Sequence, residues 1–78
     1  MLEYQAIVEK IVINGHHGPY AVARSEDLGL VTFSLDKKVW QEKDFPEPGI
    51  LVILSDIRKK RAGWRAYSGR FFQPYDSI

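Results

Sequence analysis

The chain has 78 residues and no cysteine, so we predict one domain over residues 1–78, without disulfides or the common cysteine-based zinc sites. Hydrophobic residues make up 45% of the chain and charged residues 27%, which is typical of a globular protein and argues against disorder. Eleven basic and ten acidic side chains give a formal net charge of +1, which by itself indicates neither a nucleic-acid-binding protein nor an enzyme for acidic substrates.

Charge is distributed unevenly along the chain. Residues 1–57 carry five basic and nine acidic side chains, a net charge of −4. Residues 58–78 carry six basic and one acidic side chain, a net charge of +5. The sequence therefore predicts an acidic body followed by a basic segment.

Runs of β-branched and aromatic residues, separated by turn residues, predict five strands. Turn signals separate them, including the Asn-Gly and Gly-Pro pairs within residues 14–19 and the polar turn 25–27. Residues 58–63 are predicted to form a basic loop before the last strand. The expected strands, in chain order, are 4–13, 20–24, 30–35, 50–57 and 64–72.

Residues 34–43 are the only segment with a helical pattern. Leu35, Val39 and Trp40 would share one face of a helix of one or two turns. Pro46 and Pro48 would end it, because neither proline can continue a helix.

Three strands, a short helix and two further strands are the element order of a five-stranded Greek-key barrel, which closes its own sheet edges. We therefore predict an all-β OB-fold barrel with a short helix between strands three and four, and with Trp40 closing the bottom of the barrel. An SH3-like or Tudor-like barrel is the alternative, and it usually has no helix at that position.

Four short motifs fall at matching points of the expected strands. The motifs are His17-Gly18-Pro19-Tyr20, Gly29–Leu35, Pro48–Val52 and Gly63-Trp64-Arg65-Ala66. The first three resemble the second-strand, third-strand and fourth-strand patterns of the RNA-binding repeat of ribosomal protein S-one, and the fourth resembles the start of the last cold-shock strand. The chain therefore resembles nucleic-acid-binding OB domains. It departs from the repeat at Thr32, where a histidine often contacts nucleic acid, and at His17, which replaces an aromatic residue.

An OB-fold barrel binds single strands by placing bases on exposed rings while cations follow the phosphates. The loop after strand one and the loop between strands four and five flank the face formed by strands two and three. Here the first loop holds His16 and His17, and the second holds residues 58–61. The predicted base-stacking residues are Tyr20 and Phe33, assisted by His17, and the predicted phosphate contacts are Arg58, Lys59, Lys60, Arg61, Arg65 and Arg70.

Several of these residues also have structural interpretations. Four cations at a hairpin tip, as in residues 58–61, are by themselves more often a solvated tip than a binding site. Phe33 shares a face with Val31 and Leu35, so it fits the core as well as the surface. Trp64, on the same strand face as the small Ala66, is expected to close the barrel core rather than to stack on a base.

Neither a metal site nor a catalytic site is expected. His16 and His17 lack a third ligand at a recognisable spacing, and no nucleophile motif or glycine-rich phosphate loop is present. We predict a non-catalytic protein without cofactor. The longest apolar run, Ile50–Leu54, is too short to span a bilayer, and the first residues lack the features of a signal peptide, so a cytoplasmic protein is expected.

The resulting hypothesis is a module that binds single-stranded nucleic acid, RNA ahead of DNA, with low sequence specificity. The alternative is a small barrel that binds a protein partner or forms a weak homodimer, because the acidic body and the basic end are complementary. In that case the exposed member of the Phe71 and Phe72 pair, together with Tyr75, would anchor the interface.

Overall fold

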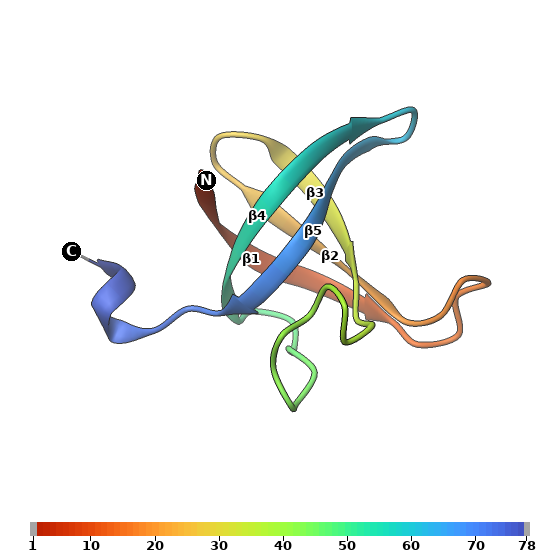
Figure 1. Ribbon diagram of the computed structural model, residues 1–78, viewed down its shortest axis with the longest axis horizontal. Coiled ribbons are helices and arrows are strands. Elements are labelled where there is room, and N and C mark those ends of the chain that lie inside the picture. The colour runs from red at the N-terminus through yellow and green to blue at the C-terminus, as the bar shows by residue number, and fades with distance from the viewer. Residues whose placement is uncertain (1, 78) are drawn as a thin grey trace.

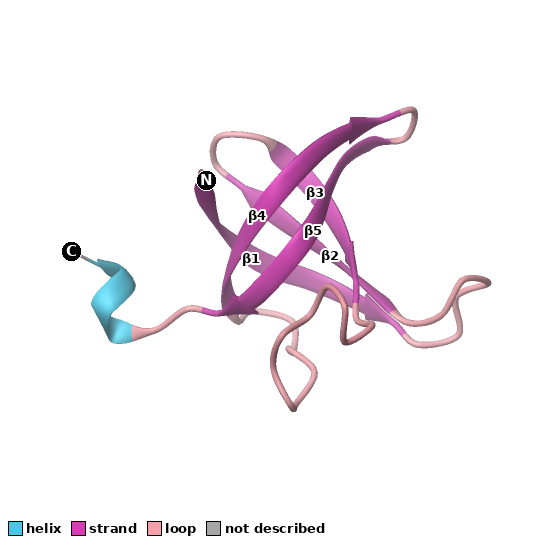
Figure 2. Cartoon of the chain, viewed as in Figure 1, coloured by secondary structure: helices cyan, strands magenta, loops and turns pink. Residues whose placement is uncertain are grey.

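Five strands wrap around one another and close into a barrel in the computed structural model, which describes residues 2–77 (Figure 1). Met1 and Ile78, the two ends of the predicted domain, lie outside the described residues. A short 3-10 helix, η1 (Pro74–Ser77), follows the last strand (Figure 2). The strands are β1 (Glu3–Val12), β2 (Tyr20–Ser25), β3 (Gly29–Ser34), β4 (Leu51–Lys60) and β5 (Gly63–Phe71).

The strands are hydrogen-bonded in the order β1-β2-β3-β5-β4, and β4 pairs back onto β1. All neighbours are antiparallel except β3 and β5, which are parallel. This is the Greek-key arrangement of an OB-fold-like barrel, so the predicted fold class is confirmed. Each predicted strand boundary lies within three residues of the observed one.

Small and large side chains alternate inside the barrel. Ala21 and Ala23 of β2 and Ala66 of β5 are fully buried. Ala21 and Ala66 are the cross-strand partners of Phe33 and leave room for its large ring, whereas Ala23 is paired with Val31. Such a small-large pattern fills the interior of a narrow barrel. The largest fully buried side chains are those of Trp40, Phe33, Leu54, Val8, Val31 and Val52.

The helix predicted over residues 34–43 is not formed, and this prediction is corrected. A single turn replaces it, in which the Val39 and Trp40 N–H groups both donate to the Asp36 carbonyl, at 2.9 and 2.8 Å. The chain then becomes extended and pairs with β5, because the Gly69 N–H donates to the Val39 carbonyl and the Gln41 N–H donates to the Gly69 carbonyl, both at 2.9 Å. Backbone groups that pair with β5 are unavailable for helical hydrogen bonds, so the helix stops after one turn.

Trp40 closes the bottom of the barrel, as predicted. Its ring stacks on Phe33 with centroids 5.7 Å apart and meets Phe71 edge-on at 5.0 Å. Its indole N–H donates to the Asp44 carbonyl at 2.8 Å, which satisfies the one polar group of a side chain that is 2% exposed. The segment between β3 and β4 therefore serves as a plug (Figure 1).

β4 changes its inward face at Asp56, which has a φ of 53°. Before this residue Val52 and Leu54 are buried, whereas after it Ile57 packs against the core and Arg58 is exposed. The left-handed backbone at Asp56 therefore sets which cations of the following segment face outward. Within residues 2–77 there is no helix with the length and apolar composition needed to cross a bilayer.

Candidate nucleic-acid interface

The β1–β2 loop is a tight turn that presents two histidines. The Gly18 N–H donates to the Gly15 carbonyl at 3.2 Å, and His16 and His17 are exposed at the tip. A Cβ on Gly15 would lie 2.7 Å from the Gly18 carbonyl oxygen and 3.1 Å from the Tyr20 ring. Glycine at position 15 therefore lets the loop pack closely against Tyr20.

A cavity of about 460 Å³ lies between this loop and the β4–β5 hairpin. We call it the histidine-side cavity. It brings together three residues that the sequence assigns to one ligand, namely His17, Tyr20 and Arg65. Its lining consists of residues 15–20 with Thr32, Ser34, Ala62 and Arg65.

A second cavity, of about 490 Å³, adjoins the first, since both are lined by Thr32 and Ala62. We call it the tryptophan-side cavity, and its other lining residues are Glu9, Lys10, Val22, Leu30 and Trp64. Trp64 is half-buried and packs against the core, as predicted, yet it is also one of the residues that line this cavity. The Lys59 ammonium lies 4.7 Å from the Trp64 ring centroid.

A row of outward side chains crosses all five strands beneath these cavities. Directly paired residues share a face of a sheet. Strand neighbours lie about 4.8 Å apart, so a row over five strands spans about 19 Å. The row consists of Lys10, Val22, Thr32, Arg65 and Arg58, each paired with the next. It has an apolar and hydroxyl-bearing centre with cations at both ends.

Three cations surround one tyrosine on the outer face of the β4–β5 hairpin. The Arg58 guanidinium lies 4.3 Å from the Tyr67 ring centroid, the Lys60 ammonium 5.5 Å and the Arg65 guanidinium 6.0 Å. We call these four residues the hairpin cluster. Cations at such distances are attracted to the negative face of an aromatic ring.

The predicted basic loop over residues 58–63 is largely strand, which corrects that prediction. Arg58, Lys59 and Lys60 are the last residues of β4, and only Arg61 and Ala62 form the turn. Pairing continues to Lys60 and Gly63, whose φ of 126° is accessible to glycine. A regular hairpin therefore fixes the cations on defined faces, with Arg58 and Lys60 outward and Lys59 beside Trp64.

Phe33 does not reach the interface, and its predicted stacking role is wrong. It is 0% exposed and packs against Trp40 in the core. Alternation along β3 buries Val31 and Phe33 and leaves Thr32 on the outside. Of the two predicted stacking residues, only Tyr20 lines a cavity on this face.

Arg70 lies apart from the hairpin cluster and is already paired with carboxylates. Its two terminal nitrogens donate to the Asp76 carboxylate at 2.9 and 3.0 Å, and Glu3 lies 3.6 Å away. It belongs to the end of β5 that leads into η1. The structure therefore assigns Arg70 to holding the C-terminal turn rather than to the cavities.

This ion pair makes the docking of η1 dependent on pH. The Arg70 guanidinium and the Gln73 N–H hold the pKa of the Asp76 carboxyl below its ordinary value of 3.8, and the pairing raises the pKa of Arg70. Since a lowered carboxyl pKa stabilises the folded form above the ordinary value, the contact is fully present above pH 3.8 and is lost as pH falls through the lower folded-state pKa. We expect Asp76→Asn at pH 7 to lower the protection of the Gln73 amide, measured as its exchange rate relative to the intrinsic rate at that pH, because the charged acceptor of its N–H is lost. Unchanged exchange in Asp76→Asn would contradict the assignment.

Tyr67 and Lys10 are absent from the residues predicted for the site. A two-residue turn at positions 61 and 62 pairs Arg58 with Arg65, and from that register Tyr67 follows on the same face. The register of this hairpin is the feature that would have indicated Tyr67 as a site residue. Lys10 faces the site because β1 has an irregularity between Val8 and Lys10, which the sequence indicates only as a break in alternation.

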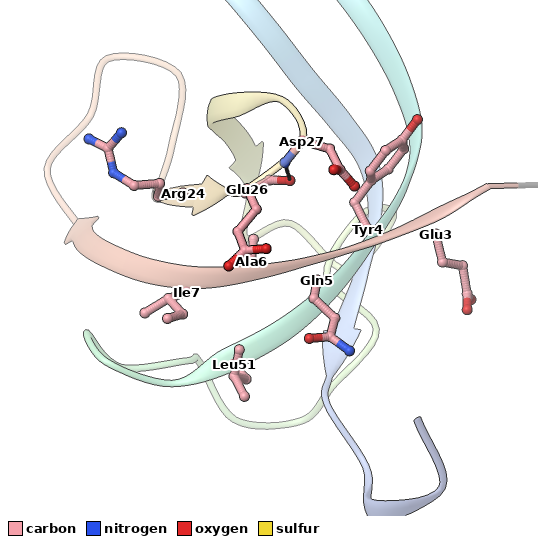
Figure 3. Close-up of a pocket in the computed structure, with 10 residues that line it drawn as sticks. Glu3, Tyr4, Gln5, Ala6, Ile7, Arg24, Glu26, Asp27 and Leu51 are labelled. Carbon is pink, nitrogen blue, oxygen red and sulfur yellow. Dashed lines mark hydrogen bonds between the residues drawn. The ribbon is translucent and has the colours of Figure 1, made fainter. Parts of the chain in front are cut away.

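A third cavity, of about 400 Å³, has the opposite charge (Figure 3). Glu3, Glu26 and Asp27 line it, with Glu26 and Asp27 on one side of β1 and Glu3 on the other. Arg24 points away from Asp27, and its guanidinium binds Glu9 at 2.6 Å. Three carboxylates beside the single cation Arg24 make the lining of this cavity unfavourable for a phosphate group.

No protein-family model, no curated protein and no solved structure matches this chain. Among residues 2–77, no group of three histidine or carboxylate side chains is arranged to hold a metal ion. The choice of function therefore depends on the residues and geometry of the two adjacent cavities and the hairpin cluster.

Proposed function

We propose that this chain is a non-catalytic module that binds single-stranded nucleic acid, RNA ahead of DNA, with low sequence specificity. One observation carries the proposal. The outward row from Lys10 to Arg58 runs beneath two adjacent cavities, with Tyr20 in one, Trp64 in the other and the hairpin cluster at one end. Rings beside cations are the combination that single strands require.

In this proposal the bases stack on Tyr20 and Trp64 while the phosphates meet the hairpin. Each stacked base contributes about 1–3 kcal/mol, and stacking accepts any base because every base has a π-face. Arg58, Lys60 and Arg65 would neutralise phosphates, with Lys59 and Arg61 on the same hairpin adding to the local positive potential. His17 would contact the strand from the β1–β2 loop. We also propose that the chain is related to cold-shock and S-one OB domains, which its motifs resemble, and that it acts in the cytoplasm.

Tryptophan fluorescence tests the proposal because the two tryptophans differ in position. Trp64 lines a cavity, whereas Trp40 is buried beneath the barrel. We expect short single-stranded homopolymers to quench the emission saturably. The Trp64→Phe variant should lose the quenching while still binding a labelled oligonucleotide, measured by anisotropy, because phenylalanine retains a ring for stacking.

Two results would reject this assignment. The first is an absence of anisotropy change with every RNA and DNA homopolymer tried. The second is quenching that persists in Trp64→Phe, since the ligand would then be perturbing Trp40.

The rival proposal, a protein-binding or self-associating barrel, has its own observation. Ile7 of β1 and Leu51 of β4 are paired and exposed by 49% and 38%, and both line the third cavity, together with Glu3, Glu26 and Asp27. Tyr75 is exposed by 66%, whereas Phe71 packs against Trp40 and is not available as an anchor. Light scattering at low and high salt separates the two proposals, because a salt-sensitive dimer that ignores oligonucleotides would favour the rival.

A further inference from the structure

We propose that the hairpin cluster is a separate phosphate site, which receives the backbone of the bound strand where it leaves the cavities, and that the phosphate replaces Asp56 on Arg58. This inference rests on the proposed function. It adds the path that the bound strand follows from the two cavities to the hairpin cluster. The cluster lies on the outer face of β4 and β5, beyond the β2–β3 face that holds the two cavities.

Charge is the first argument for an anion at this site. Arg58 and Arg65 are direct cross-strand partners, and like charges placed opposite each other destabilise a sheet. Lys60 adds a third cation around the same ring. In the part of the chain that the structure describes, Asp56 is the one carboxylate that forms an ion pair with these cations. The cluster therefore retains a local excess of positive charge.

Tyr67 holds the cations together without neutralising them. Arg58 lies over the ring at 4.3 Å, closer than Lys60 or Arg65. A ring attracts the flat face of a guanidinium and leaves its N–H groups free at the edge. Those N–H groups form the two-pronged donor that suits a phosphate.

In the free protein these N–H groups of Arg58 form long, weak hydrogen bonds to the Asp56 carboxylate. The carboxylate oxygens lie 3.3 Å from Nε and 3.2 Å from Nη2 of Arg58, longer than the 2.7–2.9 Å of a strong charge-assisted pair. Both side chains are partly open to solvent. Asp56 is also the one non-glycine residue among residues 2–77 with a positive φ, an uncommon conformation that often marks a functional position. A phosphate group could therefore displace the Asp56 carboxylate from Arg58 at little cost.

Arg65 connects the cluster to the cavities. It lines the histidine-side cavity, and its guanidinium lies 6.0 Å from the Tyr67 ring centroid. Its neighbours in the outward row are Thr32 under the cavities and Arg58 in the cluster. A strand that leaves the histidine-side cavity therefore reaches Arg58 across one strand spacing, about 4.8 Å.

The test compares Asp56→Asn with Glu47→Gln. Asparagine tolerates a positive φ and removes only the charge. Glu47 is an exposed residue of the segment between β3 and β4, which lies below the barrel in Figure 1, whereas the hairpin turn lies at the top, so its variant controls for net charge. We expect Asp56→Asn to bind an eight-nucleotide homopolymer about two- to fivefold more tightly, as loss of an exposed competing ion pair implies, and Glu47→Gln to bind like the wild type.

Two further arms define the site. Tyr67→Leu should weaken binding of the eight-nucleotide strand about two- to fivefold, whereas Tyr67→Phe, which keeps the ring, should not. A three-nucleotide strand, which the cavities alone accommodate in this proposal, should not distinguish Asp56→Asn or Tyr67→Leu from the wild type. Sodium phosphate at matched ionic strength serves as the free-anion probe. At millimolar concentration it should not shift the NMR resonances of the Tyr67 ring.

The outcomes separate the two proposals. If no strand binds the wild type, the proposed function fails. If strands bind but Asp56→Asn equals Glu47→Gln, a phosphate does not replace Asp56 on Arg58. If the variants act equally on both strand lengths, the cluster is not a separate site beyond the cavities. Either result overturns this inference and leaves the proposed binding of single strands in place. Saturable binding of inorganic phosphate at the cluster without length dependence would also overturn it, because the site would then serve a free anion.

Discussion

Replacing Trp40 by alanine is expected to destabilise the barrel by about 3–5 kcal/mol, the usual cost of removing a large buried aromatic side chain. Trp40 is 2% exposed, stacks on Phe33 and meets Phe71 edge-on. A small domain has a total stability of roughly 5–15 kcal/mol, so this one substitution threatens the fold. Urea unfolding followed by circular dichroism measures the loss.

Tyr75→Ala is the matched control, since it also removes an aromatic ring. Tyr75 is exposed by 66%, so we expect a change within about 0.5 kcal/mol. A loss below about 1 kcal/mol in Trp40→Ala would show that the segment between β3 and β4 does not close the barrel.

Removing the charge of the hairpin cluster should have the largest effect on binding. In Arg58→Gln/Lys60→Gln/Arg65→Gln three phosphate contacts are lost, and each contact to a single strand contributes about 0.7 to the slope of log K against log salt. The slope should therefore flatten by about 2, and affinity at about 0.15 M salt should fall roughly fiftyfold if the affinity extrapolated to 1 M is unchanged. Thermal stability should be unchanged or higher, because the Arg58–Arg65 repulsion is removed as well.

The chain supplies a matched control in three exposed lysines between β3 and β4. Lys37→Gln/Lys38→Gln/Lys43→Gln removes the same charge at the bottom of the barrel, away from the hairpin turn (Figure 1). We expect it to bind like the wild type. Equal losses in the two triple variants would mean that affinity follows net charge rather than the hairpin cluster.

Local sequence pattern was sufficient for the strands and for the barrel. The β-branched runs and the turn residues mark five strands, and closure of the sheet edges leaves few topologies for them. The helix over residues 34–43 could not be excluded from sequence, because the competing pairing of Trp40 with Gly69 joins residues far apart in the chain. Long-range backbone pairing overrode a short helical pattern.

The candidate site was only partly predictable for a similar reason. His17, Tyr20 and Arg65 were predicted and share one cavity, because the fold class determines which loops flank that face. Phe33 was equally compatible with either face, and the register of β3 decides that it is buried. Tyr67 depends on the register of the hairpin and on the positive φ of Asp56, neither of which a strand pattern specifies.

The salt dependence of the affinity for a single-stranded homopolymer tests the central claim most directly. If about four cations meet phosphates, log K should fall against log salt with a slope near −3. That result requires the basic charge to be gathered at one face, since the formal net charge of the whole chain is only +1. Binding with a slope near zero, or no binding at low salt, would contradict the account.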